Sequence, residues 1–311
     1  MATRLVRYGD LVPCRNAFID TRTPGSSEKE NFTIIGPGVS ENPEQHVHIS
    51  EPHGFNIGAA RQPPHCVNSQ HSHETAEVFV VHSGTWTFNF GETGDDHRIE
   101  AGPGTVASIP TGLFRGFTNI GEDTGFLWVA LGGDDPGHVL WAPYVFDMAQ
   151  DYGLVLLEDG QLVDTVKGEA IPLGVRPMPR TTAEQAAAMK RPSKAELCGC
   201  VVTPPEMPLQ PAGPMSALGL DERLLISPDA KLSWPHPFTL SRARLEPGAT
   251  SGPTTANVPT VVFVHDGDLV LQWADGHLTM GVGDTLTMPT GLKHRFASAS
   301  GAHVFIVRGN A

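Results

Sequence analysis

The chain has 311 residues, of which 40% are apolar, so it is long enough for two domains with cores of their own. Its formal net charge is -13 and it contains no run of lysine or arginine, which argues against nucleic acid or an anionic membrane as a partner. No signal-peptide core and no apolar run long enough to cross a bilayer is present. We therefore expect a cytoplasmic protein whose four cysteines, Cys14, Cys66, Cys198 and Cys200, remain free thiols.

The composition favours an all-β fold, because glycine (34) and proline (27) are plentiful and aromatic residues make up only 7%. Residues 1–50 show no clear pattern of secondary structure, and they are long enough to add an edge strand to one of the barrels. From residue 76 to 130, short apolar runs separated by Gly and Asp predict an antiparallel meander. These runs are EVFVVH, TWTFNF, TVASIP and FLWVAL.

The same order returns near the C-terminus as TVVFVHDG, DLVLQW, DTLTMP and HVFIVRG. The tetrapeptide PTGL occurs at 110–113 and again at 289–292, and a Phe follows each copy at the same spacing. The spacing between matched positions indicates that the second copy is shorter by four residues in one hairpin loop. This is a duplication at the scale of a domain. We predict an N-terminal barrel at 1–150, a connector at 151–216 and a C-terminal barrel at 217–311.

The connector is predicted to be partly helical. Between the two copies, GHVLWAPYVFDMAQDYG reads as a short helix, LVLLEDGQLVD as a hairpin, and TTAEQAAAMK as a helix in which Thr181 and Glu184 form a capping box. The proline-rich stretch 191–216 is predicted to be extended.

Residues 71–77, HSHETAE, place two histidines and a glutamate at metal-ligand spacing. His71, His73 and Glu77 share parity, so on one strand their side chains would project from one face. Imidazole nitrogens with a carboxylate oxygen suit Fe, Mn, Ni, Cu or Zn and leave positions open for substrate. Surface histidines without a metal are the alternative.

These residues resemble the two motifs of the cupin superfamily. The first motif, G-x5-H-x-H-x3,4-E-x6-G, is matched by His71, His73, Glu77 and Gly84, with His65 in place of the first glycine. The second, G-x5-P-x-G-x2-H-x3-N, is matched by Gly104, Pro110, Gly112 and Asn119, with Arg115 in place of the histidine. The C-terminal copy keeps Gly248, Gly267, Gly283, Pro289, Gly291 and His294, but its other ligand positions hold Thr254, Ala256 and Thr260.

The resemblance implies a bicupin, that is, two tandem double-stranded β-helix (jelly-roll) barrels joined by a short, partly helical connector. It also implies one divalent transition metal, Fe(II) in the first instance, in the first barrel, while the second barrel is metal-free. His65, too far along the strand to reach that metal, is expected at the barrel rim.

Arg115 cannot be a metal ligand, because a guanidinium has no lone pair to donate. Three roles stay open. Arg115 pairs with Glu77 and abolishes the metal site, it points outward, or it lies beside the metal and binds a substrate carboxylate or enolate with two hydrogen bonds. We favour the third role.

The aromatic residues around the site predict an apolar pocket, with substrate contacts from Phe79, Trp86, Phe88, Phe117 and Asn119 in addition to Arg115. The expected function is an Fe(II) dioxygenase acting on a small anionic aromatic, enol or diketone substrate with dioxygen. A redox-neutral decarboxylase, isomerase or lyase is the first alternative, and a non-catalytic small-molecule-binding cupin is the second. Homo-oligomers are compatible with this reading.

Overall fold

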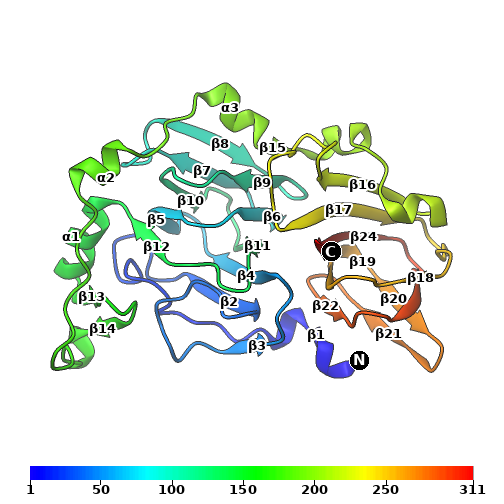
Figure 1. Cartoon of the computed structure of the whole chain (residues 1–311), viewed down its shortest axis with the longest axis horizontal. Coiled ribbons are helices and arrows are strands. Elements are labelled where there is room, and N and C mark those ends of the chain that lie inside the picture. The colour runs from blue at the N-terminus through cyan, green and yellow to red at the C-terminus, as the bar shows by residue number, and fades with distance from the viewer. Residues whose placement is uncertain (311) are drawn as a thin grey trace.

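The fold is two β-barrels that lie side by side, as seen in a computed structural model that describes residues 1–310 (Figure 1). The first barrel is built by the blue to green part of the chain and the second by the yellow to red part. The predicted all-β class and tandem barrels are confirmed. No helix within residues 1–310 is long and apolar enough to span a membrane.

The first barrel closes a seven-stranded sheet against a five-stranded sheet. In spatial order the larger sheet contains β15 (Val201–Val202), β9 (Val106–Ile109), β6 (Glu77–Ser83), β11 (Gly125–Gly132), β4 (Phe55–Gln62), β2 (Glu30–Ile35) and β3 (Val47–Ile49). The smaller sheet contains β12 (Val139–Trp141), β5 (Val67–His73), β10 (Arg115–Asn119), β7 (Trp86–Phe90) and β8 (His97–Ala101).

The second barrel repeats this plan with six and four strands. Its larger sheet contains β1 (Leu5–Val6), β22 (Thr285–Met288), β19 (Thr260–Gly267), β24 (Ala302–Gly309), β17 (Phe238–Leu245) and β16 (Asp221–Ile226). Its smaller sheet contains β18 (Thr254–Thr255), β23 (Lys293–Ala297), β20 (Leu269–Trp273) and β21 (Gly276–Met280). The β7–β8 loop spans 91–96 and the β20–β21 loop only 274–275, which is the predicted four-residue difference.

Each barrel receives one edge strand from a distant part of the chain. The N-terminal strand β1 pairs with β22 of the second barrel, and β15 of the connector pairs with β9 of the first. Figure 1 shows the blue N-terminal segment beside the second barrel. The first residues of the expected N-terminal unit therefore complete the other barrel, a pairing that no local pattern indicates.

Helix α1 (Pro143–Asp151) ends where the predicted connector begins, and the connector itself contains the hairpin β13 (Leu154–Leu156) and β14 (Leu162–Asp164) and the helices α2 (Ala183–Ala187) and α3 (Lys194–Gly199). Residues 1–310 also contain 3-10 helices, two near the N-terminus, η1 (Ala2–Arg4) and η2 (Tyr8–Asp10), and three in or near the connector, η3 (Thr165–Lys167), η4 (Pro204–Leu209) and η5 (Pro214–Leu218).

Two details of the connector were predicted wrongly. The capping box of α2 is formed by Thr182 and Gln185, one residue later than expected, because the Thr181 hydroxyl donates to the buried Trp141 carbonyl oxygen. The stretch 191–216 is not extended throughout. It holds α3, η4 and η5, the last two of which begin at a proline, whose fixed φ and missing N–H suit the first helical position.

Three apolar cores organise the two barrels. One fills the first barrel and one fills the second. The third lies between the barrels, where the outer faces of their larger sheets meet. There Trp128 of β11 stacks on Phe263 of β19 with ring centroids 5.0 Å apart, and the Trp128 indole N–H donates to the Thr285 hydroxyl. The barrels thus share a continuous buried interface.

Candidate metal centre

The two histidines lie on β5, in the sheet that closes the first barrel. His71 and His73 are two residues apart on this strand, so their side chains project from the same face into the barrel. Strand β5 is held between β12 and β10, with His71 opposite Trp141 on one side and Arg115 on the other. Both imidazoles are buried.

Glu77 lies on a different strand from the histidines. Residues 74–76 turn the chain, and Glu77 is the first residue of β6 in the larger sheet. The expectation that one strand presents all three side chains is therefore wrong. They converge because the turn carries the chain from one sheet to the other.

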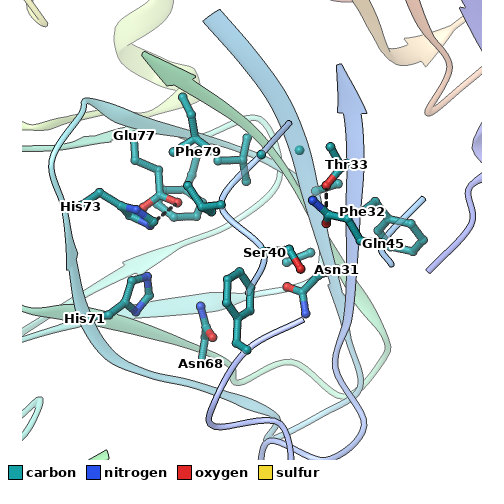
Figure 2. Close-up of a pocket in the computed structure, with 18 of the residues that line it drawn as sticks. Asn31, Phe32, Thr33, Ser40, Gln45, Asn68, His71, His73, Glu77 and Phe79 are labelled. Atoms are coloured by element: carbon teal, nitrogen blue, oxygen red, sulfur yellow. Dashed lines mark hydrogen bonds and ion pairs between the residues drawn. The ribbon is translucent and has the colours of Figure 1, made fainter. Parts of the chain in front are cut away.

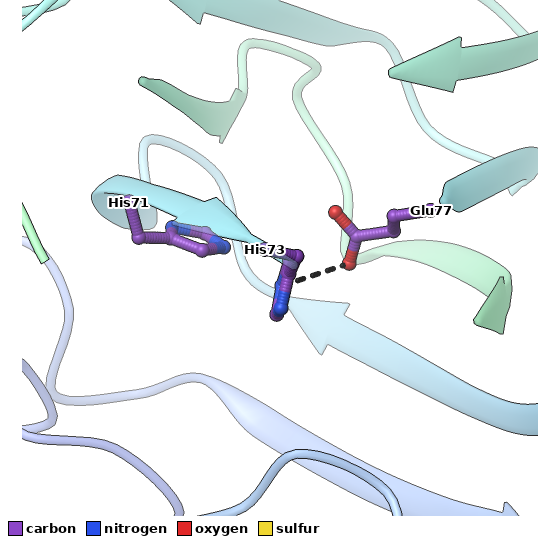
Figure 3. A group of neighbouring side chains, drawn as sticks. All are labelled: His71, His73 and Glu77. Carbon is purple, nitrogen blue, oxygen red and sulfur yellow. Dashed lines mark ion pairs between the residues drawn. The ribbon is translucent and has the colours of Figure 1, made fainter. Parts of the chain in front are cut away.

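The three side chains converge on one point inside the barrel (Figure 3). One donor atom from each of His71, His73 and Glu77 lies within 4.8 Å of the other two. The His71 Nδ1 lies 2.6 Å from the Ser69 carbonyl oxygen, so its proton is held there and Nε2 keeps a free lone pair. The His73 Nε2 lies 3.5 Å from Glu77 Oε1, and its buried Nδ1 has no hydrogen-bond partner within the described chain.

Burial sets the protonation of this group. It lowers the pKa of His71 and of His73 well below the usual range, and the positive charge of Arg115 adds to the effect. Both imidazoles are therefore neutral at pH 7, the form that binds metals. Burial raises the pKa of Glu77, against the opposing effect of Arg115.

Arg115 is buried at the edge of this group and does not point outward. Its Nη2 forms an ion pair with Glu77 Oε2, and its Nη1 donates to the His71 carbonyl oxygen at 2.8 Å. Of the three roles open from the sequence, the structure has the pairing with Glu77. Since Oε2 receives the guanidinium, Oε1 remains directed at His73.

A cavity of about 70 Å³ opens beside the three side chains (Figure 2). Its wall is mostly apolar and includes Phe79, Phe117, Val129 and Leu131. Its polar lining is neutral outside the His71, His73 and Glu77 group, with the side chains of Asn31, Asn68, Ser40, Thr33 and Gln45. The Asn31 Nδ2 is buried and has no hydrogen-bond partner in residues 1–310.

Four of the expected substrate contacts lie elsewhere. Arg115, Trp86, Phe88 and Asn119 are not part of the cavity lining within the described residues. Trp86 and Phe88 are fully buried in the apolar core of the first barrel, behind Phe117. The Asn119 amide donates to backbone carbonyl oxygens of Gln62 and Asp123, so it holds a turn.

Several residues near the centre carry no sequence signal. The fully buried Lys29 forms an ion pair with Asp20 and donates to the Asn68 side chain, while Asp20 accepts from the Ser69 N–H. On the other side, Trp141 packs on His71 with ring centroids 5.1 Å apart. The contacts of Lys29 and Asp20 to β5 join segments far apart in the chain, and their sequence neighbourhood is unremarkable in composition.

Three further histidines lie in a turn or at the interface between the barrels, away from the candidate metal centre. His65 is exposed at the turn before β5 with φ +62°, and the matching residue in the other barrel is Gly248 with φ +76°. His65 therefore occupies a left-handed position that normally favours glycine. His82 and His265 face each other across the interface between the barrels, with their Nδ1 atoms 3.3 Å apart.

The second barrel lacks the donors of the first. Thr254 pairs with His294 in the same register as His71 with Arg115. Residues 1–310 contain one group of three histidine, cysteine or carboxylate side chains arranged to hold a metal ion, and it is the one in the first barrel.

The first-barrel residues fit a divalent transition metal. The set offers two neutral imidazoles and a carboxylate, the donors that such ions take. One donor atom from each of the three residues lies within 4.8 Å of the other two, so a single ion would contact all three.

Comparison with known proteins identifies the same barrel. Residues 60–130 match the family described as cupin domain. A search of curated proteins found no match. Among solved structures, vicilin from Capsicum annuum aligns over 99% of this chain and 86% of its own, with 14% identity and a TM-score of 0.61.

Two other solved structures share the fold at similarly low sequence identity. Oxalate decarboxylase from Bacillus subtilis aligns over 99% of this chain and 76% of its own, with 11% identity and a TM-score of 0.58. AerE from Microcystis aeruginosa aligns over 97% of both chains, with 8% identity and a TM-score of 0.51. At these identities the likeness concerns the fold, and the named activities belong to those proteins.

Proposed function

Because this chain is a bicupin of the cupin superfamily, we propose that its first barrel is the active site of a metal-dependent enzyme acting on a small substrate. The observation that carries the proposal is the convergence of His71, His73 and Glu77 within 4.8 Å at the wall of a cavity. A buried donor set beside a concave, mainly apolar space is typical of sites where small molecules react.

In this proposal the two imidazoles and Glu77 Oε1 hold the ion. A divalent metal at this place supplies Lewis-acid polarisation and, where it is iron(II), redox chemistry with dioxygen. Arg115 acts as a positioning residue, since it fixes Oε2 of Glu77 and the backbone of His71 without reaching the cavity. Such contacts to ligand side chains typically change metal affinity 10- to 100-fold.

The cavity favours a small enol or diketone over a substrate that needs a cationic partner. Arg115 is paired with Glu77 outside the cavity lining, and beyond His71, His73 and Glu77 the polar lining is amide and hydroxyl. The unpartnered Asn31 Nδ2 is available to donate to a substrate oxygen. Phe79 and Phe117 offer an apolar surface to its carbon skeleton. Dioxygenation of such a substrate is the reaction we propose, and redox-neutral isomerisation or lyase chemistry is its competitor.

Metal analysis of the purified protein tests the site. We expect about one first-row transition metal per chain, lost in His71→Ala, His73→Ala and Glu77→Ala. His294→Ala is the matched control, because it removes the buried histidine at the corresponding place of the second barrel. Full metal occupancy in His73→Ala would refute the site, and metal loss in His294→Ala would move it to the second barrel.

An oxygen electrode tests the reaction. The iron-loaded protein is expected to consume dioxygen with 2,4-pentanedione as probe, and His73→Ala is expected to be inactive. Conversion of the diketone without oxygen uptake would favour the redox-neutral alternative.

A non-catalytic small-molecule binder is the second candidate, and the Arg115–Glu77 ion pair favours it. If this pair neutralises Glu77 permanently, the wild-type protein will contain no metal, although the cavity remains. Metal content therefore separates the two candidates directly.

A further inference from the structure

The second barrel has a cavity of its own, of about 230 Å³. Its wall includes Met288, Phe296 and Ile306, which are apolar, together with Thr254, His294 and Arg308. This space is larger than the cavity of the first barrel, although the second barrel has lost the metal donors.

Strand register shows where the chemistry differs between the two barrels. In the first barrel Glu77 lies opposite Leu131, and in the second Thr260 lies opposite Arg308. The carboxylate of the first barrel is thus replaced by a hydroxyl, and an apolar wall residue is replaced by a guanidinium. The exchange removes a metal ligand and adds a group that binds anions.

The guanidinium of Arg308 is held in place by a buried network. Its Nη1 donates to Glu222 Oε1 at 2.7 Å and to the Ser241 hydroxyl at 3.0 Å. Glu222 is fully buried and also accepts from the Met215 N–H and the Ser241 hydroxyl. The Glu222 carboxylate thus accepts hydrogen bonds from three donors, which are Arg308 Nη1, the Met215 N–H and the Ser241 hydroxyl. Both described hydrogen bonds of the Arg308 guanidinium are donated by Nη1. Its Nε and Nη2 have no partner within residues 1–310.

His294 supplies a hydrogen-bond acceptor to the same cavity. Its Nδ1 lies 2.9 Å from the Leu292 carbonyl oxygen, so the proton resides there and Nε2 carries the lone pair. Burial lowers the pKa of His294, and nearby Arg308 adds to this, which keeps the ring neutral. A neutral imidazole beside a guanidinium pairs an acceptor with a donor.

An open cleft on the outside of the second barrel shares His294 with this cavity. This cleft has a volume of about 620 Å³ and is also lined by Trp273, His277, Lys293 and Arg295. Lys293 and Arg295 are exposed on a chain whose formal charge is -13. A local excess of positive charge on an acidic protein attracts anions to this place.

We propose that the second barrel is a metal-free binding site for a small 2-hydroxy acid with an apolar side chain. The carboxylate pairs with the free N–H groups of Arg308, and the hydroxyl donates to His294 Nε2. The apolar side chain packs on Met288, Phe296 and Ile306. The two barrels of one chain then carry different chemistry, a metal-dependent site and an anion site.

Isothermal titration of the full chain with mandelate tests this proposal. Mandelate carries the carboxylate, hydroxyl and apolar ring, and mandelamide lacks only the charge. We expect one mandelate per chain, bound at least tenfold more tightly than mandelamide. His294→Leu should weaken mandelate binding about tenfold, and Arg308→Gln with Glu222→Gln by about 10- to 100-fold. The second variant changes both partners so that no buried charge is left unpaired.

The first barrel provides the control, because mandelate could bind a metal there. His71→Ala should leave the mandelate affinity unchanged. The proposal is overturned if mandelate binding is lost in His71→Ala, or if the wild type binds mandelamide as well as mandelate. Retention of full affinity in both second-barrel variants, with circular dichroism unchanged, also overturns it.

Discussion

Arg115, on β10, contacts two of the three candidate ligands, one on β5 and one on β6. Its guanidinium reaches the Glu77 carboxylate and the His71 carbonyl oxygen, and all three residues are buried. A buried carboxylate that loses its cation is left without compensation, so the pair matters for stability as well as for the ligand geometry.

Arg115→Gln should lower both the stability of the protein and its affinity for the metal. We expect the unfolding free energy of the metal-free protein to fall by about 3 to 5 kcal/mol, because Glu77 remains buried and unpaired. Metal affinity should fall about 10- to 100-fold, since Oε2 is no longer fixed. Urea unfolding and a chelator competition measure the two effects. Unchanged metal affinity would show that Arg115 has no part in positioning Glu77.

Arg115→His separates the enzyme from the inert binder. The new imidazole would stand opposite His71 and offer a fourth donor, so metal should be retained against a chelator at least as well as in the wild type. If the wild type is purified without metal and only Arg115→His contains it, the ion pair has abolished the site and the binder is the correct reading.

At the scale of elements, strand β5 is fixed from outside by the segment before β2. Asp20 accepts from the Ser69 N–H, and Lys29 donates to the Asn68 side chain. Ser69 in turn holds the Nδ1 of His71, so this contact orients a candidate ligand through its strand.

Breaking the Lys29–Asp20 pair should therefore be costly. Lys29→Met is expected to lower the unfolding free energy by about 3 to 5 kcal/mol, because Asp20 stays buried without a cation. Arg15→Met is the control, since its ion pair with Glu30 is exposed at Arg15 and should contribute less than about 1 kcal/mol. Equal urea midpoints for the two variants would contradict a structural role for the buried pair.

At the scale of the whole molecule, the interface between the barrels contains a histidine pair. His82 and His265 occupy equivalent places in the two copies, and burial lowers the pKa of each to about 4. For His82 the neighbouring His265 adds to the effect, and for His265 His303 does so, while Asp266 opposes it. The rings pack against Phe126 and Phe263.

This pair should make the protein less stable in mild acid. The pKa of each histidine is about 6.5 in the unfolded chain and about 4 in the folded chain. Between these pH values the unfolded chain therefore binds more protons than the folded chain. The unfolding free energy thus falls as the pH drops through this range, by up to about 1.4 kcal/mol per pH unit for each histidine.

Urea unfolding between pH 7.5 and 4.5 checks the sign. The double variant His82→Gln and His265→Gln should show a shallower loss, whereas His277→Gln, which changes an exposed histidine, should follow the wild type. Parallel curves for the double variant and the wild type would exclude the pair as a source of acid sensitivity.

Much of the fold could be predicted from the sequence, because the strands have local apolar patterns and because the same pattern occurs in both copies. Alternating apolar runs predicted the barrel strands, and the repeated PTGL turn fixed the duplication and the shortened hairpin. The spacing of His71, His73 and Glu77 indicated a convergent group, although the reason given, one shared strand face, was wrong. The motif spacing holds whether the three residues share one strand or, as here, lie on two strands joined by a turn.

The tertiary structure alone decided what lies opposite each side chain. The partner of Arg115, the network of Lys29 and Asp20, and the Glu222 contact of Arg308 all join residues distant in sequence. The pairing of β1 with the second barrel and of β15 with the first is of the same kind. Sequence periodicity reports which face of a strand is buried. It carries no record of which distant group meets that face, because this depends on how the sheets close and pack.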